Sequence, residues 1–311
     1  MGRIDDALRR VGQLPRTEVT PGGGGTPAAE AFVSPWAFRE PTDVPATAER
    51  PASVTPVVAA NPLAAALDAP SGLAQHGFSR FSNNWVPRLV IAKDANRLLV
   101  EEFRQLAATL HHTQTTGNLR VVLVTSAEPN EGKSTTALNL ALTFSESYQR
   151  NVLLIDADLR RPSLHEITQV PNTSGLSETL KATGEYKLPL FQLSDTLMLA
   201  PAGRPNSNPM TALTSPRMRD MLVEASARFD WVIIDAPPIG PIADSSLLAP
   251  LADGVLLVVR SRRTYYAAAQ KAVDAIGRER VLGVVLNDVE VKESRAYYHY
   301  YYGPAETETQ R

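Results

Sequence analysis

The segment from Val121 to Thr135, with the sequence VVLVTSAEPNEGKST, constrains the fold more than any other part of this chain. It begins with an apolar run of strand length, continues through a short polar loop, and reaches Gly132-Lys133-Ser134. A stretch with helical apolar spacing follows, because Ala137, Leu140, Ala141 and Phe144 recur at the intervals of one helix face. A strand that turns through such a loop into a helix holds phosphate groups at the helix N-terminus. The segment therefore predicts a phosphate-binding loop, or P-loop.

The residue types in this loop match the chemistry of a bound nucleotide. Gly132 lets the backbone approach the phosphates, Lys133 reaches the β- and γ-phosphates, and the Ser134 hydroxyl is a ligand for Mg²⁺. Ala127 stands where a P-loop usually has its first glycine, and a small residue still permits that turn. An ordinary strand-to-helix turn is the alternative, and the correct flanking elements disfavour it. The predicted ATP-binding residues are Ala127, Glu128, Pro129, Asn130, Glu131, Gly132, Lys133, Ser134 and Thr135.

Acidic residues follow two further apolar runs. Asp156 and Asp158 end the run that begins at Leu153, and Asp235 ends the run that begins at Trp231. In open α/β sheets, ligands bind at the carboxyl ends of the strands. Three carboxylates there can hold Mg²⁺ and orient or deprotonate a nucleophile, as phosphoryl transfer requires. Taken alone, each aspartate fits a cap or a turn equally well, so the prediction rests on their combination with the P-loop.

The rest of the chain from about residue 88 predicts an α/β fold, with a mostly parallel sheet and helices on both faces. Apolar runs alternate with helical stretches and are apolar at consecutive positions, as in strands buried on both faces. We expect a helix that is capped by Asp94 and presents Leu99, Phe103, Leu106 and Leu110 on one face. The expected strands are 88–92, 121–125, 152–155, 197–200, 232–234, 255–259 and 281–286.

The N-terminal part has a different composition. Eleven of the 24 prolines and no lysine fall in residues 1–87, so residues 13–85 are predicted to form a disordered arm. Residues 1–12 predict a short amphipathic helix, which is either a fraying solvated helix or a docking peptide. An apolar cluster of Phe78, Phe81 and Trp85 is expected to pin the arm to the folded body.

Composition excludes several classes of function. The chain has no cysteine, which removes disulfides, thiolate zinc sites, iron–sulfur clusters and cysteine nucleophiles. A net charge of −2 gives no support for nucleic-acid binding through bulk positive charge. No apolar run approaches the roughly 20 residues of a membrane span, so we expect that the chain does not cross a membrane by itself.

A dense tyrosine cluster lies near the C-terminus. Five of the nine tyrosines fall within six residues, at Tyr297, Tyr298, Tyr300, Tyr301 and Tyr302. Adjacent tyrosines cannot all face one interior, so core packing does not explain the cluster. It is either an aromatic docking patch or a set of phosphoryl acceptors, since several phosphates would give the segment a large negative charge.

The P-loop, the Asp156-Ala-Asp158-Leu-Arg160 segment, the Asp235-Ala-Pro-Pro segment and the tyrosine cluster together resemble the bacterial tyrosine kinase (BY-kinase) family of capsule and exopolysaccharide systems. The resemblance covers about residues 88–302. It implies a P-loop NTPase fold of the MinD/ParA type, with a kinase domain at 86–290 and a tyrosine tail at 291–311. It also implies an ATP- and Mg²⁺-dependent autokinase that phosphorylates this tail and regulates polysaccharide polymerisation and export.

The same resemblance implies roles for individual residues. Lys133 holds ATP, Asp156 orients or deprotonates the incoming tyrosine hydroxyl, and Arg160 fixes the carboxylates or contacts phosphate. Ser134, Asp158 and Asp235 organise Mg²⁺, and Asn287 recognises adenine. Family members insert the tail into a neighbouring subunit of a ring, and Glu101 and Arg104 match the first two members of an interface motif whose last arginine is Ala107 here. A solvated ion pair on one helix is the alternative for that pair.

The resemblance further implies partners and a location. Some members are free cytoplasmic chains that a separate membrane protein activates, and this chain is similar to them. We therefore expect a membrane-bound chain-length regulator, a resetting tyrosine phosphatase, and peripheral association with the inner face of the membrane. Two other functions remain open, a non-catalytic ATP-binding scaffold and a MinD/ParA-type positioning ATPase. The second carries a signature lysine where this chain has Glu128, and it lacks a tyrosine tail.

Overall fold

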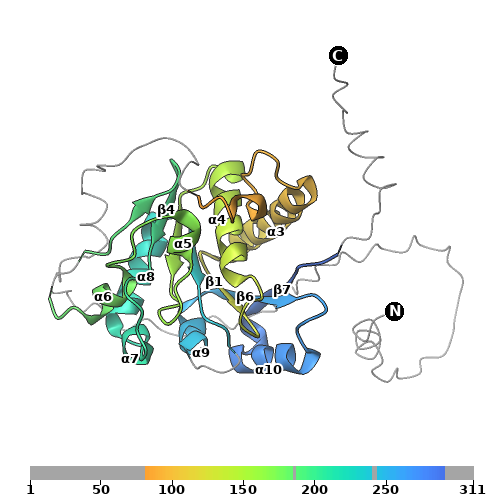
Figure 1. Ribbon diagram of the computed structural model, residues 1–311. Helices are drawn as coiled ribbons and strands as arrows, with labels where there is room; N and C mark the ends of the chain where they lie inside the picture. Colours follow the sequence, from red (N-terminus) through yellow and green to blue (C-terminus); the bar gives the residue numbers. More distant parts are fainter. Residues whose placement is uncertain (1–80, 185–186, 240–243, 291–311) are drawn as a thin grey trace, which may run out of the picture.

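The computed structural model describes residues 81–184, 187–239 and 244–290. A seven-stranded sheet runs through this part of the chain in the order β3-β4-β2-β5-β1-β6-β7 (Figure 1). All neighbouring strands are parallel except β3 and β4, which are antiparallel. The strands are β1 Val121–Ser126, β2 Val152–Asp156, β3 Phe191–Gln192, β4 Leu197–Ala200, β5 Trp231–Asp235, β6 Gly254–Arg260 and β7 Val281–Asn287.

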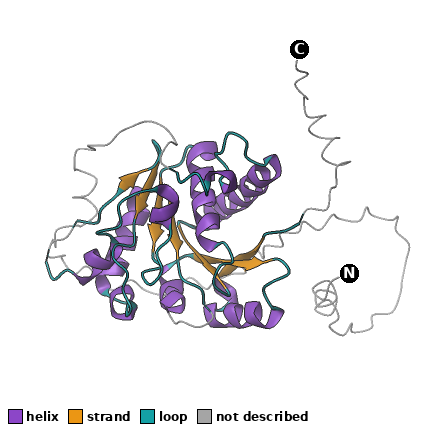
Figure 2. Ribbon diagram, in the orientation of Figure 1, coloured by secondary structure: helices purple, strands orange, loops and turns teal. Residues whose placement is uncertain are grey.

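Helices cover both faces of this sheet (Figure 2). One apolar cluster contains residues of α3, α4 and α5, and the cluster on the opposite face contains residues of α6 to α10. The helices are α3 Arg97–Thr116, α4 Lys133–Tyr148, α5 Leu164–Thr168, α6 Leu176–Lys181, α7 Met210–Leu213, α8 Pro216–Arg228, α9 Asp244–Leu248 and α10 Tyr266–Ile276. Three short 3₁₀ turns complete the described elements, at Val86–Arg88, Ala249–Leu251 and Arg278–Arg280.

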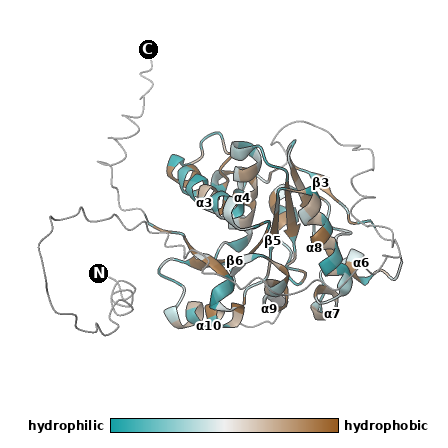
Figure 3. Ribbon diagram, turned by 180° about the vertical axis from the view of Figure 1, so that it is seen from behind, coloured by the Kyte–Doolittle hydropathy of each residue, from teal (hydrophilic) through white to brown (hydrophobic). Residues whose placement is uncertain are grey.

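The central strands are buried on both faces. Every residue of β1, β2 and β5 is buried, which explains their unbroken apolar runs. Figure 3 shows these strands as hydrophobic, whereas much of α3 is hydrophilic. Helix α4 is buried along most of its length, and Phe144 in it stacks on Trp231 of β5 with ring centroids 4.2 Å apart. The predicted mostly parallel α/β architecture is confirmed.

Two local expectations were wrong, and one short strand was missed. Residues 88–92 do not form a strand: Leu89 is buried in the cluster with α3 and α4, and the chain turns there instead. Asn96 caps α3 in place of Asp94, since its side chain accepts the N–H of Leu98 at 2.9 Å. The two-residue strand β3 was not expected.

The folded body begins before the predicted end of the arm. Phe81 is 5% exposed within the cluster that contains α3 and α4, and Trp85 packs against the same cluster. The expected pinning is therefore observed for these two residues, whereas Phe78, the helix at 1–12 and most of the arm lie outside the described residues. Within the described part of the chain, no helix is both long and apolar enough to span a bilayer.

Candidate functional site

The predicted P-loop connects β1 to α4 at the carboxyl edge of the sheet. Ala127 is buried at its start, and Gly132 at its end has a φ of +91°, which favours glycine. A Cβ on Gly132 would also lie 2.0 Å from Nδ2 of Asn287, so a larger residue would displace that side-chain amide. Lys133 then opens α4. The loop thus has the geometry in which backbone N–H groups and a helix N-terminus surround an anion.

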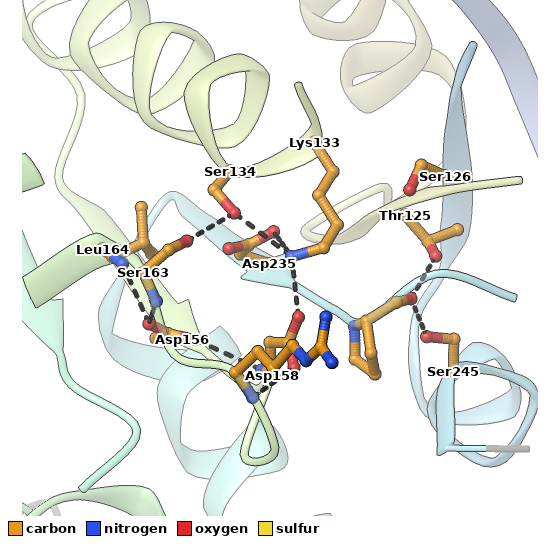
Figure 4. A network of polar contacts seen from close by, with 12 residues as sticks. Thr125, Ser126, Lys133, Ser134, Asp156, Asp158, Ser163, Leu164, Asp235 and Ser245 are labelled. Atoms are coloured by element: carbon orange, nitrogen blue, oxygen red, sulfur yellow. Dashed lines mark hydrogen bonds and ion pairs between the residues drawn. The ribbon is translucent and has the colours of Figure 1, made fainter. Parts of the chain in front are cut away.

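Lys133 lies at the centre of a charged cluster (Figure 4). Its Nζ is 2.9 Å from Oδ2 of Asp158 and 3.5 Å from Oδ1 of Asp235. Burial by itself lowers the pKa of Lys133, but the carboxylates of Asp235, Asp158 and Asp156 outweigh burial and raise this pKa above its usual value. The side chain is therefore a permanently protonated cation among three carboxyl groups. A triphosphate is negatively charged, as carboxylates are, and can replace them as the partner of Lys133.

Asp156 and Asp158 stand two residues apart but have different surroundings. Asp156 is fully buried, and its two oxygens accept the backbone N–H groups of Asp158, Ser163 and Leu164 at 3.1–3.2 Å. Burial, followed by the nearby charge of Asp235, raises the pKa of Asp156 to about 8. Asp158 instead contacts Lys133 and accepts the N–H of Arg161 at 3.0 Å. Asp156 thus holds the turn that leads into α5, and Asp158 faces the lysine.

One carboxyl oxygen of Asp235 lacks a hydrogen-bond partner among the described residues. The residue is fully buried, and its Oδ2 has no hydrogen-bond partner among the described residues. Burial raises the pKa of Asp235, although Lys133 and Ser134 favour the charged form. The chain after it is fixed, because the carbonyl of Pro237 accepts hydroxyl hydrogen bonds from Thr125, at 2.7 Å, and from Ser245. An orphaned buried carboxyl oxygen at a fixed position is suited to a cation ligand.

These donors fit a magnesium ion that is bound together with nucleotide. Ser134 Oγ lies 3.2 Å from Lys133 Nζ and 2.9 Å from Ser163 Oγ, so a hydroxyl and the free oxygen of Asp235 share one small region. No group of three or more histidine or carboxylate side chains that could hold a metal occurs in the described ranges. Mg²⁺ commonly binds through one or two protein ligands with phosphate and water completing its shell, so this small donor set is the expected one.

A cleft of about 560 Å³ opens beside this cluster, which is within the usual range for small-molecule sites. Lys133, Ser134 and Asp158 line it, whereas Asp156 does not. Arg160 also lines the cleft and donates to the carbonyl of Ser207. The remaining lining residues are Trp85, Pro129, Asn130, Gly132, Thr135, Arg161, Ser163, Ile167, Pro237 and Pro238. The structure thus brings six of the nine predicted ATP-binding residues together with Asp158 and Arg160 around one cavity, with Asp235 beside Lys133. Ala127, Glu128 and Glu131 do not line this cavity.

Other predicted site residues lie at the edges of this cleft or away from it. Asn287, expected at adenine, donates from Nδ2 to the carbonyl of Glu131 at 2.9 Å and so contacts the P-loop itself. Glu101 and Arg104 lie on α3, and among the described residues no ion pair joins them. Arg104 lines a separate cavity of about 520 Å³ with Tyr148. The five tyrosines at 297–302 lie outside the described residues.

One residue at the P-loop was missed by the sequence analysis. Thr264 forms a hydrogen bond from the loop between β6 and α10 to Oε1 of Glu131. A lone threonine 133 positions from its partner belongs to no spacing pattern. The only available signal was the presence of an acidic residue inside a loop that is meant to bind anions, because such a residue needs a partner of its own.

This chain is similar to known proteins in both sequence and fold. A family model described as the CobQ/CobB/MinD/ParA nucleotide binding domain matches residues 122–301. The tyrosine-protein kinase YwqD of Bacillus subtilis is 34% identical over 203 residues, which cover 64% of this chain and 85% of that protein. The succinoglycan biosynthesis transport protein ExoP of Rhizobium meliloti is 36% identical over 219 residues, 67% of this chain but 27% of that protein. The kinase domain of the Escherichia coli tyrosine kinase ETK superposes with a TM-score of 0.60 at 27% identity, over 73% of this chain and 88% of that domain.

Proposed function

The chain belongs to the bacterial tyrosine-protein kinases and carries the CobQ/CobB/MinD/ParA nucleotide-binding domain, and from this we propose that its own C-terminal tyrosines accept the phosphoryl group. It is a protein-tyrosine kinase of the kind found in capsule and exopolysaccharide synthesis. The observation that carries the kinase assignment is the cluster of Lys133 with Asp158 and Asp235 beside the P-loop cleft. These residues can bind the triphosphate of ATP, contribute to a cation site and supply a group that accepts a proton.

In the proposed reaction, a tyrosine hydroxyl attacks the γ-phosphorus of ATP, the bond to the β-phosphate oxygen breaks, and ADP leaves. Lys133 exchanges its carboxylate partners for the phosphate oxygens and balances the charge that moves toward ADP. Asp158 accepts the phenolic proton, since it lines the cleft and is released when Lys133 moves. Mg²⁺, held by Ser134 and Asp235 together with the nucleotide, would neutralise phosphate charge when bound.

This assignment changes the roles that the family resemblance implied for both aspartates. Asp156 was expected at the tyrosine hydroxyl, but both of its oxygens accept backbone N–H groups and it does not line the cleft. Asp158 was expected at the metal, but it contacts Lys133 and lines the cleft. A general base must reach the proton that it removes, so the geometry favours Asp158 for this step.

The test measures phosphotyrosine on the purified full chain after incubation with ATP and Mg²⁺. We expect phosphate on a tail peptide in the wild type, no signal in K133M, and loss of the signal when Tyr297, Tyr298, Tyr300, Tyr301 and Tyr302 are all changed to Phe. The matched control changes Tyr265 and Tyr266 to Phe, because these two are 77% and 58% exposed but lie outside the tail. Phosphotyrosine that survives the five tail changes, or disappears in the control, would refute tail autophosphorylation.

Transfer between molecules follows from the same proposal, with Glu101 and Arg104 at a ring interface. Mixing K133M, which keeps its tail, with the active tail-Phe protein should phosphorylate K133M. The variant E101A/R104A should reduce this transfer and the size of the assembly in solution. If K133M stays unmodified in the mixture, the tail is phosphorylated only by its own molecule.

A membrane-bound chain-length regulator is the proposed activator, and a tyrosine phosphatase the proposed reset enzyme. ExoP, whose matched region is about a quarter of its length, supports a link between this domain and polysaccharide transport. Adding the cytoplasmic segment of a candidate regulator should raise phosphotyrosine in the wild type, and co-expression should move the chain to the membrane fraction. Activity and location that ignore every regulator encoded beside this chain would contradict the partner.

A further inference from the structure

Glu131 is a buried carboxylate inside a loop that binds anions. It is 3% exposed and lies next to Gly132 and Lys133, where a negative charge would repel a triphosphate. Its two oxygens point elsewhere: Oε2 accepts the backbone N–H of Glu128 at 2.8 Å, and Oε1 is hydrogen-bonded to Thr264. The side chain therefore does not bind phosphate. Instead, it connects the P-loop at Glu128 and Glu131 to the neighbouring loop that carries Thr264.

The direction of the bond from Thr264 follows from its other contact. Thr264 Oγ1 accepts the backbone N–H of Arg260 at 2.7 Å, so the single hydroxyl proton is free for Glu131. A carboxylate only accepts, and hydrogen bonds to charged groups are stronger than those between neutral groups. Serine could replace Thr264 in this bond, whereas valine, which has the same shape, could not.

The loop that carries Thr264 is itself anchored. Arg260 contacts Oδ2 of Asp288 through Nε at 2.7 Å and through Nη2 at 2.6 Å, and the N–H of Ser261 donates to the carbonyl of Asn287 at 2.8 Å. Asn287 in turn donates to the carbonyl of Glu131. The P-loop is thus held through both the backbone and the side chain of Glu131, by two segments that do not line the cleft.

We propose that Thr264 is a positioning residue for nucleotide binding: its hydroxyl, through Glu131, fixes the P-loop in the conformation whose backbone N–H groups receive the phosphates. Without this bond, Glu131 loses a partner for a buried charge and the loop samples other conformations. Nucleotide must then select the competent one, which lowers the apparent affinity. The proposal rests on nucleotide binding at this loop, and it concerns neither the phosphoryl acceptor nor the assembly.

The experiment is a double-mutant cycle on the full chain, with the dissociation constant of ATP in the presence of Mg²⁺ measured by calorimetry. We expect a rise of roughly tenfold in T264V, the size of one lost hydrogen bond to a charged group. E131Q removes the charge and leaves one acceptor oxygen where the carboxylate of Glu131 uses two, so it should also raise the dissociation constant. The loss in the double variant should be smaller than the two single losses combined, because both substitutions act on the bond between Thr264 and Glu131. T264S should recover most of the affinity. T214V is the matched control, since Thr214 follows α7 and its hydroxyl donates to the carbonyl of Met210, outside the cleft.

Thermal melting, kinase kinetics and nucleotide binding test the role of Thr264 independently. Melting of each variant without nucleotide identifies any that fails to fold, in which case T264S and E131Q carry the comparison. In kinase assays the KM for ATP should rise while kcat changes by less than about threefold, as expected when only binding is weakened. Wild-type affinity in T264V and E131Q, multiplied losses in the double variant, or failure of T264S to recover would overturn the proposal. Binding is measured without phosphoryl transfer, so absence of autophosphorylation would refute the proposed function alone.

Discussion

The two sides of the P-loop differ in how completely their polar side chains are hydrogen-bonded. On the cleft side, Lys133 is shared between two carboxylates, and Asp235 keeps an unpaired buried oxygen. On the brace side, defined by Glu131, Thr264 and Asn287, the side-chain bonds hold the loop from behind. Unsatisfied or exchangeable polar atoms mark the side where a ligand binds, and complete hydrogen bonding marks the side that fixes geometry.

Asp156 shows that this division does not follow sequence motifs. It lies in the same short motif as Asp158, but it accepts three backbone N–H groups and so fixes the local backbone, as the residues of the brace side do. Asp158 lines the cleft and pairs with Lys133, the residue proposed to bind the nucleotide phosphates. The two aspartates therefore offer a direct way to separate catalysis from positioning with substitutions of equal size.

The largest expected effect is on phosphoryl transfer in D158N. Removing a general base typically costs about 100-fold or more in rate, and D158N should show such a loss with little change in stability. D156N should instead lower the free energy of unfolding by about 1–3 kcal/mol at neutral pH, because an amide nitrogen cannot accept the backbone N–H groups. Phosphotyrosine formation and urea unfolding of both variants provide the measurements. Equal activity losses, with equal stability, would mean that the two aspartates are not divided in this way.

The next effect is a dependence of stability on pH. The pKa of Asp156 is about 8 in the folded chain against an ordinary aspartate pKa of 3.8, so between these values the folded state binds more protons than the unfolded state. Stability from this group is complete at low pH and falls as pH rises toward 8, by at most about 1.4 kcal/mol per pH unit. The stability gap between wild type and D156N should therefore shrink from pH 5.5 to pH 8. A gap that widens over this range would contradict the raised pKa of Asp156.

The smallest effect concerns the outer edge of the brace side. Arg262 pairs with Glu290, but the two side chains are 59% and 69% exposed, so R262A should cost less than about 0.5 kcal/mol. R260A is the matched variant, because Arg260 is 29% exposed and makes two contacts with Asp288, and it should cost more. Urea unfolding of both variants measures the difference. A larger loss in R262A than in R260A would place the anchor of this loop elsewhere.

Much of the fold was predictable because buried parallel strands leave a strong signal. The expected runs at β1, β2, β4, β5, β6 and β7 are confirmed to within a residue or two at each end. The run at 88–92 misled because burial against helices and burial in a sheet select the same apolar residues. Strand β3 was missed because its two residues pair only with β4 at the sheet edge and need no apolar pattern.

The site was predictable in membership but not in orientation. Placing Lys133, the two aspartates and Asp235 at one edge follows from the topology of a parallel sheet. Which aspartate faces the cleft depends on the turn from Asp158 to Leu164, whose backbone N–H groups bind Asp156. Thr264 could not be found, because its role comes only from a contact between loops that are distant in sequence.

The strand order also determines when this enzyme can first hold a nucleotide during its synthesis. β1, which carries the P-loop, pairs on one side with β5 from Val121↔Val232 and on the other with β6 from Val122↔Gly254. The braces at Thr264 and Asn287 come later still. A growing chain therefore contains the P-loop sequence long before it has the strands and loops that shape it, and non-local pairing of this kind makes folding slow. Nucleotide binding becomes possible only when nearly the whole domain has been made, shortly before the tyrosines that follow it in the chain.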